Sequence, residues 1–482
     1  MFSLTGVAGK KYAVFGLGRT GRAACAALSA AGADVFSWDE AKAARAATEG
    51  KTYEASHPKE WPWDDLVAVV LSPGVPLTHP KPHVIVRKAA QKKVPVIGDL
   101  ELFALTVNAM PADARPRVIA VTGSNGKSTT TALIGHILKE SGRKTMVGGN
   151  IGEPLLSLAG PSDDATYVLE LSSYQLELSA SFRPDVAALL NISPDHLDRH
   201  GTMENYVAAK SRIFARQTNE DCAIVGVDDT YVQGVCAALA RNPAGPAVLQ
   251  VSSTGALGAG VFALDGKLYY RLGDKTGEAG VLKSAALPGR HNAQNAAAAL
   301  ASVMREGVSP AVAMRSMERF KGLPHRSEVV AVSDGVAFVN DSKATNAAAA
   351  AYALDAYDEI YWIAGGLPKE GGAKPLRDHM TRVRKAYLIG QAAAAFATDL
   401  DGVATVVQCG DLETALLRAA EDAFNRNSPE TPRSVAVLLS PACASQDQFR
   451  DYEHRGETFR ILASRLVSAR SDGRPQNNGE AA

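Results

Sequence analysis

The sequence predicts an α/β protein of three domains built on mostly parallel sheets, and three observations support this fold class. The chain has 482 residues, which at roughly 150 residues a domain gives about three domains. Short apolar runs alternate with helical patterns along most of its length, which is typical of strands wound with helices. Hydrophobic residues make up 46% of the chain and charged residues 21%, so each domain has enough apolar residues for a full core.

Breaks in the alternating pattern place the domain boundaries. The pattern starts anew near Gly98 and again after Gly322. The expected domains are a Rossmann-like domain, a central domain of the P-loop ATPase type with a mostly parallel sheet, and a second Rossmann-like domain, at residues 1–97, 98–321 and 322–482. Residues 471–482 are polar and lack aromatic and β-branched residues, so we expect a disordered tail there.

Apolar runs and helical periodicity give the elements of each domain in order. Runs of five to seven apolar residues predict strands, and longer amphipathic or alanine-rich stretches predict helices. The expected strands are residues 12–16, 34–38, 67–72, 117–122, 166–171, 186–192, 222–227, 335–340, 360–365, 386–390, 405–409 and 435–440. The expected helices that matter most for function are residues 20–31, 128–140 and 203–217.

The composition argues against several classes of function. The 51 basic and 51 acidic residues give a formal net charge of zero, so there is no general attraction to nucleic acid or to an anionic membrane. The longest apolar runs are too short to span a bilayer, and the N-terminus lacks a secretory signal. The five scattered cysteines include no Cys-x-x-Cys pair, which argues against a zinc site or a disulfide framework. We therefore expect a cytoplasmic protein with reduced thiols.

The strongest local signal is a nucleotide-binding loop between a predicted strand and a predicted helix. The run Thr122-Gly123-Ser124-Asn125-Gly126-Lys127-Ser128-Thr129 follows a short apolar stretch. Backbone N–H groups of such a turn face phosphate oxygens, and the helix N-terminus adds positive potential. Lys127 can neutralise the outer phosphates, and the Ser128 hydroxyl can ligate Mg²⁺. The general motif has glycine where this chain has Val121, so Gly123 is expected to supply the turn. The alternative is a strand-to-helix turn without a ligand.

A second glycine-rich turn lies in the first domain. Gly16-Leu17-Gly18-Arg19-Thr20-Gly21 matches the GxGxxG pattern between a strand and a helix, and Asp39 stands at the end of the next strand. This spacing fits a dinucleotide, but the same geometry binds any diphosphate at a helix N-terminus. A further turn, Ser72-Pro73-Gly74, follows the third strand. The residues alone leave open NAD or FAD, another nucleotide, and a purely structural turn.

Two candidate metal ligands stand at strand ends of the central domain. Glu170 lies near the C-terminal end of the strand at 166–171, where parallel sheets place their chemistry. His196 lies in the run NISPDHLDRH that follows the next strand. Together they are candidates for binding Mg²⁺ beside the phosphates, although this ion prefers oxygen ligands. His196 alone is also explained as a hydrogen-bonded loop residue.

Lys210 interrupts an apolar stripe on the helix expected at residues 203–217. The other residues of this face are Met203, Tyr206, Val207, Ile213 and Phe214. A lysine in such a stripe is costly unless it is paired or its stem reaches water. Two readings therefore stay open. The ammonium group reaches water, or burial lowers the pKa of Lys210 so that the neutral amine can add CO₂ and form a carbamate.

Taken together, the motifs resemble those of the Mur ligase family over nearly the whole chain. They are TGSNGKST (122–129), GGNIG (148–152), LELSSYQLE (169–177), NISPDHLDRH (191–200), the AAK that ends at Lys210, GLPHR (322–326), NDSKATN (340–346) and LLSPACASQDQF (438–449). The last two resemble the branch of the family that adds D-glutamate. The Asp-Asn-Pro-Arg motif of the branch that adds diaminopimelate is absent.

The resemblance implies an ATP-dependent ligase of peptidoglycan precursor synthesis. It would add D-glutamate to UDP-N-acetylmuramoyl-L-alanine through an acyl phosphate and release ADP and phosphate. ATP, two Mg²⁺ ions and a CO₂-derived carbamate on Lys210 are implied, with a monomer that binds small-molecule substrates. The GxGxxG reading thereby shifts from NAD to UDP. A folylpolyglutamate synthetase-like ligase is the alternative. A NAD-dependent dehydrogenase and a non-catalytic nucleotide-binding switch are more distant ones.

Residue roles are also implied by the resemblance, motif by motif. Catalytic roles fall to Lys127, His196, Lys210 and Lys343. ATP would contact Gly123, Ser124, Asn125, Gly126, Lys127, Ser128, Thr129, Asn292 and Asn295, with Arg326 and Asp341 coming from the third domain. The metal ligands would be Ser128, Glu170, His196 and carbamylated Lys210. The UDP-sugar would contact Gly18, Arg19, Thr20, Asp39, Ser72, Pro73, Gly74 and Asn150, and D-glutamate would contact Thr345, Lys369, Ser445 and Tyr452. Arg19 and Gln446 depart from the apolar residues usual at their positions.

Overall fold

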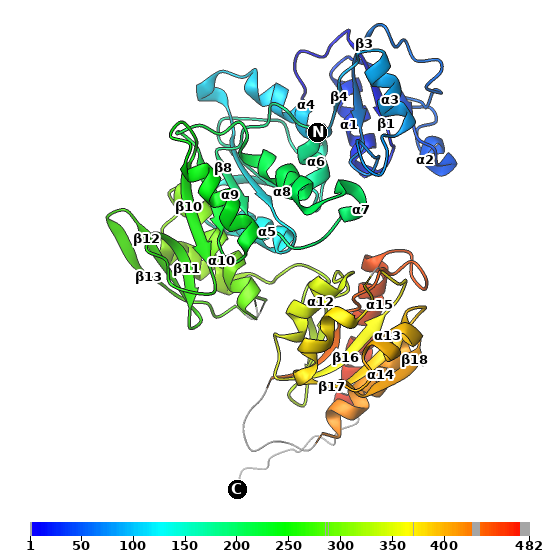
Figure 1. Cartoon of the computed structure of the whole chain (residues 1–482), viewed down its shortest axis with the longest axis vertical. Coiled ribbons are helices and arrows are strands. Elements are labelled where there is room, and N and C mark those ends of the chain that lie inside the picture. Colours follow the sequence, from blue (N-terminus) through cyan, green and yellow to red (C-terminus); the bar gives the residue numbers. More distant parts are fainter. Residues whose placement is uncertain (1, 285, 288, 370, 427–433, 473–482) are drawn as a thin grey trace. The chain divides into compact units, whose positions relative to one another are not determined.

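The computed structural model describes residues 2–284, 286, 287, 289–369, 371–426 and 434–472 (Figure 1). Its helices and mostly parallel sheets confirm the α/β fold class. The chain forms two compact units, residues 1–283 with 292–320 and residues 284–291 with 321–482. The first unit holds a four-stranded and a nine-stranded sheet, and the second holds a six-stranded sheet. A division of the first unit at residue 97 stays a prediction.

The four-stranded sheet has the order β2-β1-β3-β4, with all strands parallel. Its strands are β1 (Lys11–Phe15), β2 (Asp34–Trp38), β3 (Leu66–Leu71) and β4 (Val96–Ile97). The helices of this part are α1 (Arg19–Ala30), α2 (Lys42–Ala46) and α3 (Val84–Gln91). Because β1 is central and leads directly into α1, the GxGxxG turn lies at the carboxyl edge of the sheet.

The nine-stranded sheet has the order β13-β12-β11-β10-β9-β8-β5-β7-β6. All neighbouring strands in the part of the sheet that runs from β6 at one edge through β5 to β11 pair in parallel. Strands β12 and β13 extend the sheet beyond β11 as an antiparallel hairpin. The strands are β5 (Arg117–Thr122), β6 (Lys144–Gly149), β7 (Ala165–Glu170), β8 (Val186–Leu189), β9 (Cys222–Gly226), β10 (Ala247–Ser252), β11 (Gly260–Leu264), β12 (Lys267–Leu272) and β13 (Lys275–Val281). Strands β7 and β8 are buried along their whole length, which is why they read as continuous apolar runs.

Helices accompany this sheet along the chain. They are α4 (Asp99–Asn108), α5 (Lys127–Glu140), α6 (Ser173–Glu177), α7 (Leu197–His200), α8 (Met203–Ser211), α9 (Thr230–Ala240), α10 (Gly289–Arg305) and α11 (Pro310–Arg319). Three short 3-10 helices are η1 (Ala112–Ala114), η2 (Leu155–Ser157) and η3 (Arg212–Phe214). Side chains set several helix starts: Thr202 caps α8 and Asp229 caps α9, each by accepting a backbone N–H.

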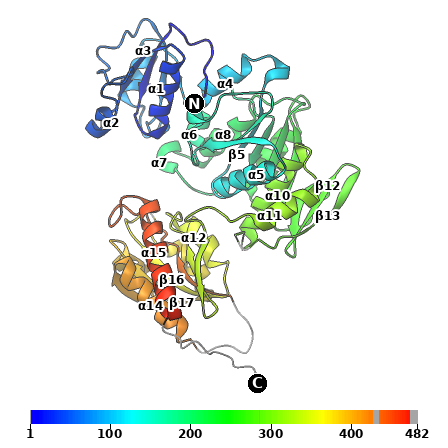
Figure 2. The same ribbon diagram turned by 180° about the vertical axis from the view of Figure 1, so that it is seen from behind.

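The six-stranded sheet has the order β14-β15-β19-β16-β17-β18, and only β14 is antiparallel to its neighbour. The strands are β14 (Glu328–Ser333), β15 (Val336–Asn340), β16 (Glu359–Gly365), β17 (Val383–Ile389), β18 (Val406–Gly410) and β19 (Val435–Leu439). The helices α12 (Ala347–Leu354), η4 (Lys374–Arg382) and α13 (Ala393–Asp399) pack in one core, and α14 (Leu412–Phe424) and α15 (Tyr452–Asp472) pack in the other (Figure 2). Helices therefore cover both faces.

Two expectations about helix ends are wrong. The helix expected at residues 203–217 ends at Ser211 and tightens into η3. The Ser211 hydroxyl donates to the carbonyl oxygen of Val207, and the Arg212 guanidinium donates to carbonyl oxygens of an adjacent loop, so the last turn closes early. The tail expected from residue 471 is wrong for Ser471 and Asp472, because α15 continues to Asp472. Residues 473–482 lie outside the described part of the chain.

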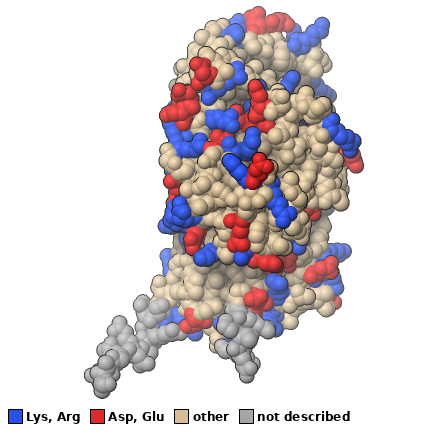
Figure 3. Space-filling model, turned by 90° about the vertical axis from the view of Figure 1, so that its left-hand side faces the viewer, with Lys and Arg blue, Asp and Glu red and all other residues tan. Residues whose placement is uncertain are grey.

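Most of the cysteine side chains lie inside the protein. The five cysteines are free thiols, and four of them are buried. Burial raises the pKa of Cys25 to about 12 and that of Cys222 to about 11. No helix within the described ranges is long and apolar enough to cross a membrane. Basic and acidic side chains are interspersed on the face drawn in Figure 3.

Gly21 allows the first turn of α1 to lie directly against the end of β1. A Cβ atom added at Gly21 would lie 1.8 Å from the carbonyl oxygen of Gly16. The Ser72 hydroxyl donates a hydrogen bond of 2.7 Å to the same carbonyl oxygen. The side chain of an alanine at position 21 would therefore force α1, β1 and the Ser72 turn apart.

We predict that Gly21→Ala lowers the thermal unfolding temperature by roughly 5 °C or more. Gly234→Ala is the matched control, because this glycine lies within α9 and an added Cβ would have no atom within 4 Å. Since alanine favours a helix over glycine by about 1 kcal/mol, the control should hold or gain stability. Calorimetry of both variants is the measurement, and equal unfolding temperatures would contradict the close packing at Gly21.

Candidate active site

The nucleotide loop connects β5 to α5 and is held in place by a neighbouring asparagine. Gly123 has φ +153° and Gly126 has φ +81°, both in the region that favours glycine. Asn191 clamps the loop: its Oδ1 accepts the Asn125 N–H at 2.9 Å, and its Nδ2 donates to the Asn125 carbonyl oxygen at 3.2 Å. Val121 is buried within β5, so Gly123 supplies the turn as expected.

Asn295 of α10 stands beside this loop, and Asn292 of the same helix is hydrogen-bonded to Asn295. Asn295 Nδ2 donates to Asn292 Oδ1 over 3.0 Å, and both side chains are buried. A Cβ atom added at Gly126 would lie 2.1 Å from Asn295 Oδ1. The loop and α10 therefore fit together only with a glycine at position 126.

Two lysine side chains converge on one backbone oxygen of the loop. Lys127 Nζ lies 3.0 Å and Lys210 Nζ lies 2.7 Å from the carbonyl oxygen of Gly123. Lys210 is only 2% exposed, so its ammonium group reaches into the loop and not to water. Burial lowers the pKa of Lys210 well below its ordinary value, and the nearby Lys127 charge lowers it further, against the opposing effect of Asp195 and Glu170.

Glu170 supplies an acidic group at the same edge of the sheet. It is the last residue of β7 and is 2% exposed. Asn150 Nδ2 donates to Glu170 Oε1 over 2.6 Å. Glu170 Oε2 is buried without a hydrogen-bond partner among the described residues. A buried carboxylate oxygen in this state is a suitable ligand for a cation.

His196 stands half-exposed in a strained loop position before α7. Its φ is +56°, an uncommon value for a residue other than glycine. Its Nδ1 is 2.8 Å from the Tyr174 hydroxyl, and its Nε2 is 3.4 Å from Asp195 Oδ2. The protein packed around the ring lowers the pKa of His196; Asp195 opposes this effect, and the nearby lysines add to it. The neutral imidazole that can bind a metal is thereby favoured.

The residues fit a nucleotide-bound Mg²⁺ better than a metal held by protein alone. Among the described residues, no three His, Cys, Asp or Glu side chains gather as a metal cluster. Magnesium usually takes only one or two carboxylates and completes its shell with phosphate oxygens and water. The unpartnered Glu170 oxygen and the buried Ser128 at the start of α5 match that requirement.

The predicted UDP-sugar residues lie in turns and at the start of α1 beside the four-stranded sheet, except Asn150, which follows β6 of the nine-stranded sheet. Asp39 Oδ2 accepts the Leu17 N–H at 2.6 Å, and Asp39 Oδ1 accepts the Ala41 N–H at 2.8 Å. Arg19 donates to the carbonyl oxygen of Gly152, close in sequence to Asn150. Gly18 caps α1 without a side-chain hydrogen bond, so its helix N-terminus stays available to an anion. Thr20, Ser72 and Pro73 are partly exposed, and Gly74 is exposed.

The second unit brings its own predicted residues together. Asp341 follows β15, and burial raises its pKa to about 6. Its Oδ2 accepts the Ser440 hydroxyl at 2.8 Å. Lys343 Nζ lies 3.8 Å from the centre of the Tyr452 ring. Thr345, Arg326 and the exposed Lys369 belong to the same unit.

Arg455 organises this part of the second unit, and sequence reasoning missed it. It is 1% exposed and donates to Ser342 Oγ at 3.0 Å and to the carbonyl oxygens of Ser342 and Cys443 at 2.9 and 3.2 Å. It therefore ties the NDSKATN segment to the segment that holds Ser445. The Ser445 hydroxyl is buried without a hydrogen-bond partner among the described residues. Its backbone N–H donates to Gln446 Oε1 at 3.2 Å.

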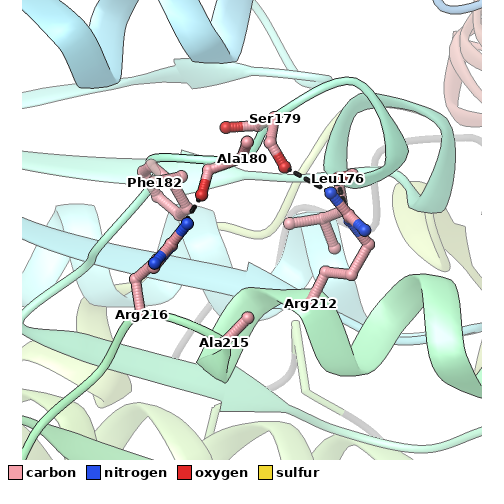
Figure 4. Close-up of a pocket in the computed structure, with 7 residues that line it drawn as sticks. All are labelled: Leu176, Ser179, Ala180, Phe182, Arg212, Ala215 and Arg216. Carbon is pink, nitrogen blue, oxygen red and sulfur yellow. Dashed lines mark hydrogen bonds between the residues drawn. The ribbon is translucent and has the colours of Figure 1, made fainter.

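A cavity of about 240 Å³ lies apart from these residues, between α6 and η3 (Figure 4). Arg212 donates to the carbonyl oxygens of Leu176 in α6 and of Ser179, and Arg216 donates to that of Ala180 in the loop that follows α6. The cavity is lined by Leu176, Ser179, Ala180, Phe182, Arg212, Ala215 and Arg216. None of the predicted site residues is among them.

Comparisons with known proteins identify relatives of this chain. Residues 121–303 match the family model described as the Mur ligase middle domain. A UDP-N-acetylmuramoylalanine–D-glutamate ligase from Phenylobacterium zucineum is 50% identical over 474 residues, which cover 98% of this chain and 100% of the relative. A relative of the same name from Caulobacter sp. strain K31 is 52% identical over 468 residues, 97% of this chain and 98% of the relative.

Solved structures share the fold at low sequence identity. A UDP-N-acetylmuramate–alanine ligase from Thermotoga maritima gives a TM-score of 0.56 at 18% identity, covering 95% of this chain and 99% of the other. A UDP-N-acetylmuramoyl-L-alanyl-D-glutamate–2,6-diaminopimelate ligase gives 0.55 at 20% identity, covering 98% and 95%. These likenesses show the three-domain architecture.

We predict that Lys127→Ala weakens ATP binding at least tenfold, because the loop loses the ammonium group nearest its phosphates. Lys139→Ala is the matched control, since Lys139 is an exposed residue in the last turn of α5. Calorimetric titration with ATP and Mg²⁺ compares the two variants with the parent chain. Equal ATP affinity in all three would remove Lys127 from the nucleotide site.

Proposed function

This chain belongs to the Mur ligase family, and we propose that it joins D-glutamate to UDP-N-acetylmuramoyl-L-alanine at the expense of ATP. One observation carries this conclusion: relatives that are 50–52% identical over almost the full chain are named UDP-N-acetylmuramoylalanine–D-glutamate ligases. The NDSKATN and LLSPACASQDQF segments support the same amino-acid specificity. The product would be a precursor of peptidoglycan.

The reaction requires activation of a carboxylate, because its direct condensation with an amine is unfavourable in water. The terminal carboxylate oxygen of the UDP substrate attacks the γ-phosphorus of ATP, ADP leaves, and an acyl phosphate forms. The amine of D-glutamate then attacks the acyl carbon and loses a proton. The tetrahedral intermediate collapses, the C–O bond breaks and phosphate leaves. Alignment of the reactants can contribute ~7–11 kcal/mol of the barrier reduction.

Positive charge must bring the anionic carboxylate to the anionic γ-phosphate. We assign Lys127 to the outer phosphates and Lys343 of the second unit to the charge that develops during transfer. Ser128, Glu170 and His196 would hold two Mg²⁺ ions. When bound, Mg²⁺ would neutralise phosphate oxygens. Asn292 and Asn295 would face the adenine, while Arg326 and Asp341 would contact ATP from the second unit.

We assign Lys210 the role of a carbamylated lysine. Its lowered pKa leaves a neutral amine that can add CO₂ with loss of a proton. The resulting carbamate is an anion beside Glu170 and Lys127, which suits a metal ligand. It would also place an anion next to the ammonium group of Lys127 at the Gly123 carbonyl oxygen.

The first domain would hold the nucleotide part of the UDP substrate, and the second unit would hold D-glutamate. Gly18, Thr20 and the turn at Ser72 lie where a diphosphate can meet the N-terminus of α1. Thr345, Lys369, Ser445 and Tyr452 would contact D-glutamate. The cytoplasmic location and the monomeric state expected from the sequence remain part of this proposal.

The function is tested by phosphate release from ATP and Mg²⁺ with UDP-N-acetylmuramoyl-L-alanine and one of four amino acids. We expect release with D-glutamate, and no release above background with L-glutamate, L-lysine or meso-diaminopimelate. Release with another amino acid would keep the ligase chemistry and contradict the assigned specificity. If no amino acid supported phosphate release and the protein was then active on folates, a folylpolyglutamate synthetase-like function would be favoured.

The role of Lys210 is tested by chemical rescue. Lys210→Ala should lose at least 100-fold in kcat, as expected when a group that acts only in the transition state is removed. A small carboxylic acid should restore part of it by standing in for the carbamate. Lys127→Ala is the control, since the same acid cannot replace an ammonium group. With ¹³C-labelled bicarbonate, a carbamate NMR signal should be present in Lys127→Ala and absent in Lys210→Ala. Full activity of Lys210→Ala without the acid would refute the role.

A further inference from the structure

Arg199 in α7 is a buried cation with unused hydrogen-bond donors. The residue is 6% exposed, and its guanidinium lies 5.2 Å from the centre of the Tyr174 ring. One nitrogen, Nη2, donates to the carbonyl oxygen of Val75 over 2.7 Å. The Nε and Nη1 nitrogens are buried and have no hydrogen-bond partner among the described residues. This guanidinium thus uses few of its five N–H donors.

The charge of Arg199 is not balanced by a nearby acid. Within the described ranges, no carboxylate lies within 4.0 Å of its guanidinium. A buried charge without a counter-charge is costly, and native proteins rarely leave buried donors unmatched. The planar fork of arginine is suited to phosphate oxygens, which accept two parallel N–H bonds. The unmatched donors therefore indicate an anionic ligand.

The position of Arg199 identifies which anion it faces. Its partner Val75 follows the Ser72-Pro73-Gly74 turn, and the Ser72 hydroxyl is bonded to the carbonyl oxygen of Gly16. Gly16 begins the turn that leads into α1. The segment after Arg199 packs on the same loop, because a Cβ atom added at Gly201 would lie 3.2 Å from the His79 ring. Arg199 thus contacts the residue that follows one turn assigned to the UDP substrate, and that turn is hydrogen-bonded to the other.

We propose that Arg199 binds a phosphate oxygen of the diphosphate in the UDP substrate and thereby positions α7. This inference rests on the proposed function. The backbone N–H of Arg199 donates to the carbonyl oxygen of His196 at 3.0 Å, so both residues belong to one short segment. A diphosphate held by Arg199 fixes that segment, and with it the imidazole assigned to the metal site. Binding of the nucleotide end of the substrate is thus transmitted to the reacting end.

Binding measurements with ligands of graded charge test the proposal. Arg199→Met and Arg199→Lys are compared with Arg216→Met, an exposed arginine that donates to the Ala180 carbonyl oxygen and has no assigned role. The ligands are UDP-N-acetylmuramoyl-L-alanine, UDP, uridine and ATP with Mg²⁺, titrated by calorimetry or ligand-observed NMR. Thermal unfolding of each variant shows whether it remains folded.

For Arg199→Met we expect the affinity for UDP and for the full substrate to fall roughly tenfold or more, with uridine and ATP unchanged. Arg199→Lys should recover part of the loss, and Arg216→Met should match the parent chain. The proposal would be overturned if Arg199→Met lowered the affinities for UDP and uridine equally, or left the affinity for UDP unchanged. Either result would show that Arg199 only stabilises the loops. Because UDP alone is a probe, this outcome is separate from the ligase assay, whose failure would concern the function itself.

Discussion

The contact on which the site depends is the meeting of two lysine ammonium groups at the carbonyl oxygen of Gly123. Two positive charges here would repel each other, and Lys210 is fully buried, so the charged form of Lys210 is unfavourable without anions nearby. The geometry is nevertheless imposed by the fold. Strand β5 fixes the loop, α8 presents Lys210 within an apolar stripe, and Asn191 prevents the loop from moving away. A triphosphate, and a carbamate on one lysine, would each relieve the repulsion.

The remaining groups are brought to the site by the order of the parallel strands. Strand β5 lies between β7 and β8, so the nucleotide loop, Glu170 and the segment after β8 share one edge of the sheet. Arg199 and the Val75 loop then connect this edge to the turns of the four-stranded sheet. The loops that follow the strands of the two sheets are thus connected to each other.

Sequence reasoning worked where one physical signal dominates. The strands at 34–38 and 117–122 have the predicted bounds, because each is a short run enriched in apolar and β-branched residues. Strand β13 was missed because its sequence KTGEAGV has no apolar alternation, and only pairing with β12 makes it a strand. The nucleotide loop was found from its motif. Other features depend on contacts between distant segments, which no local pattern encodes. They are the position of Lys210 Nζ at the nucleotide loop, the hydrogen bonds from Asn191 to that loop and the contact of the Arg199 guanidinium with Val75.

The close approach of Gly126 to Asn295 also constrains how this protein can change through evolution. The two residues are far apart in the chain, yet there is no room for a β-carbon at one while the amide occupies its place at the other. A side chain at position 126 would be strained at φ +81° and would also require a change at position 295, which in turn alters the amide pair with Asn292. Because a change at one of these positions requires a change at the other, we expect Gly126 and Asn295 to change slowly during evolution.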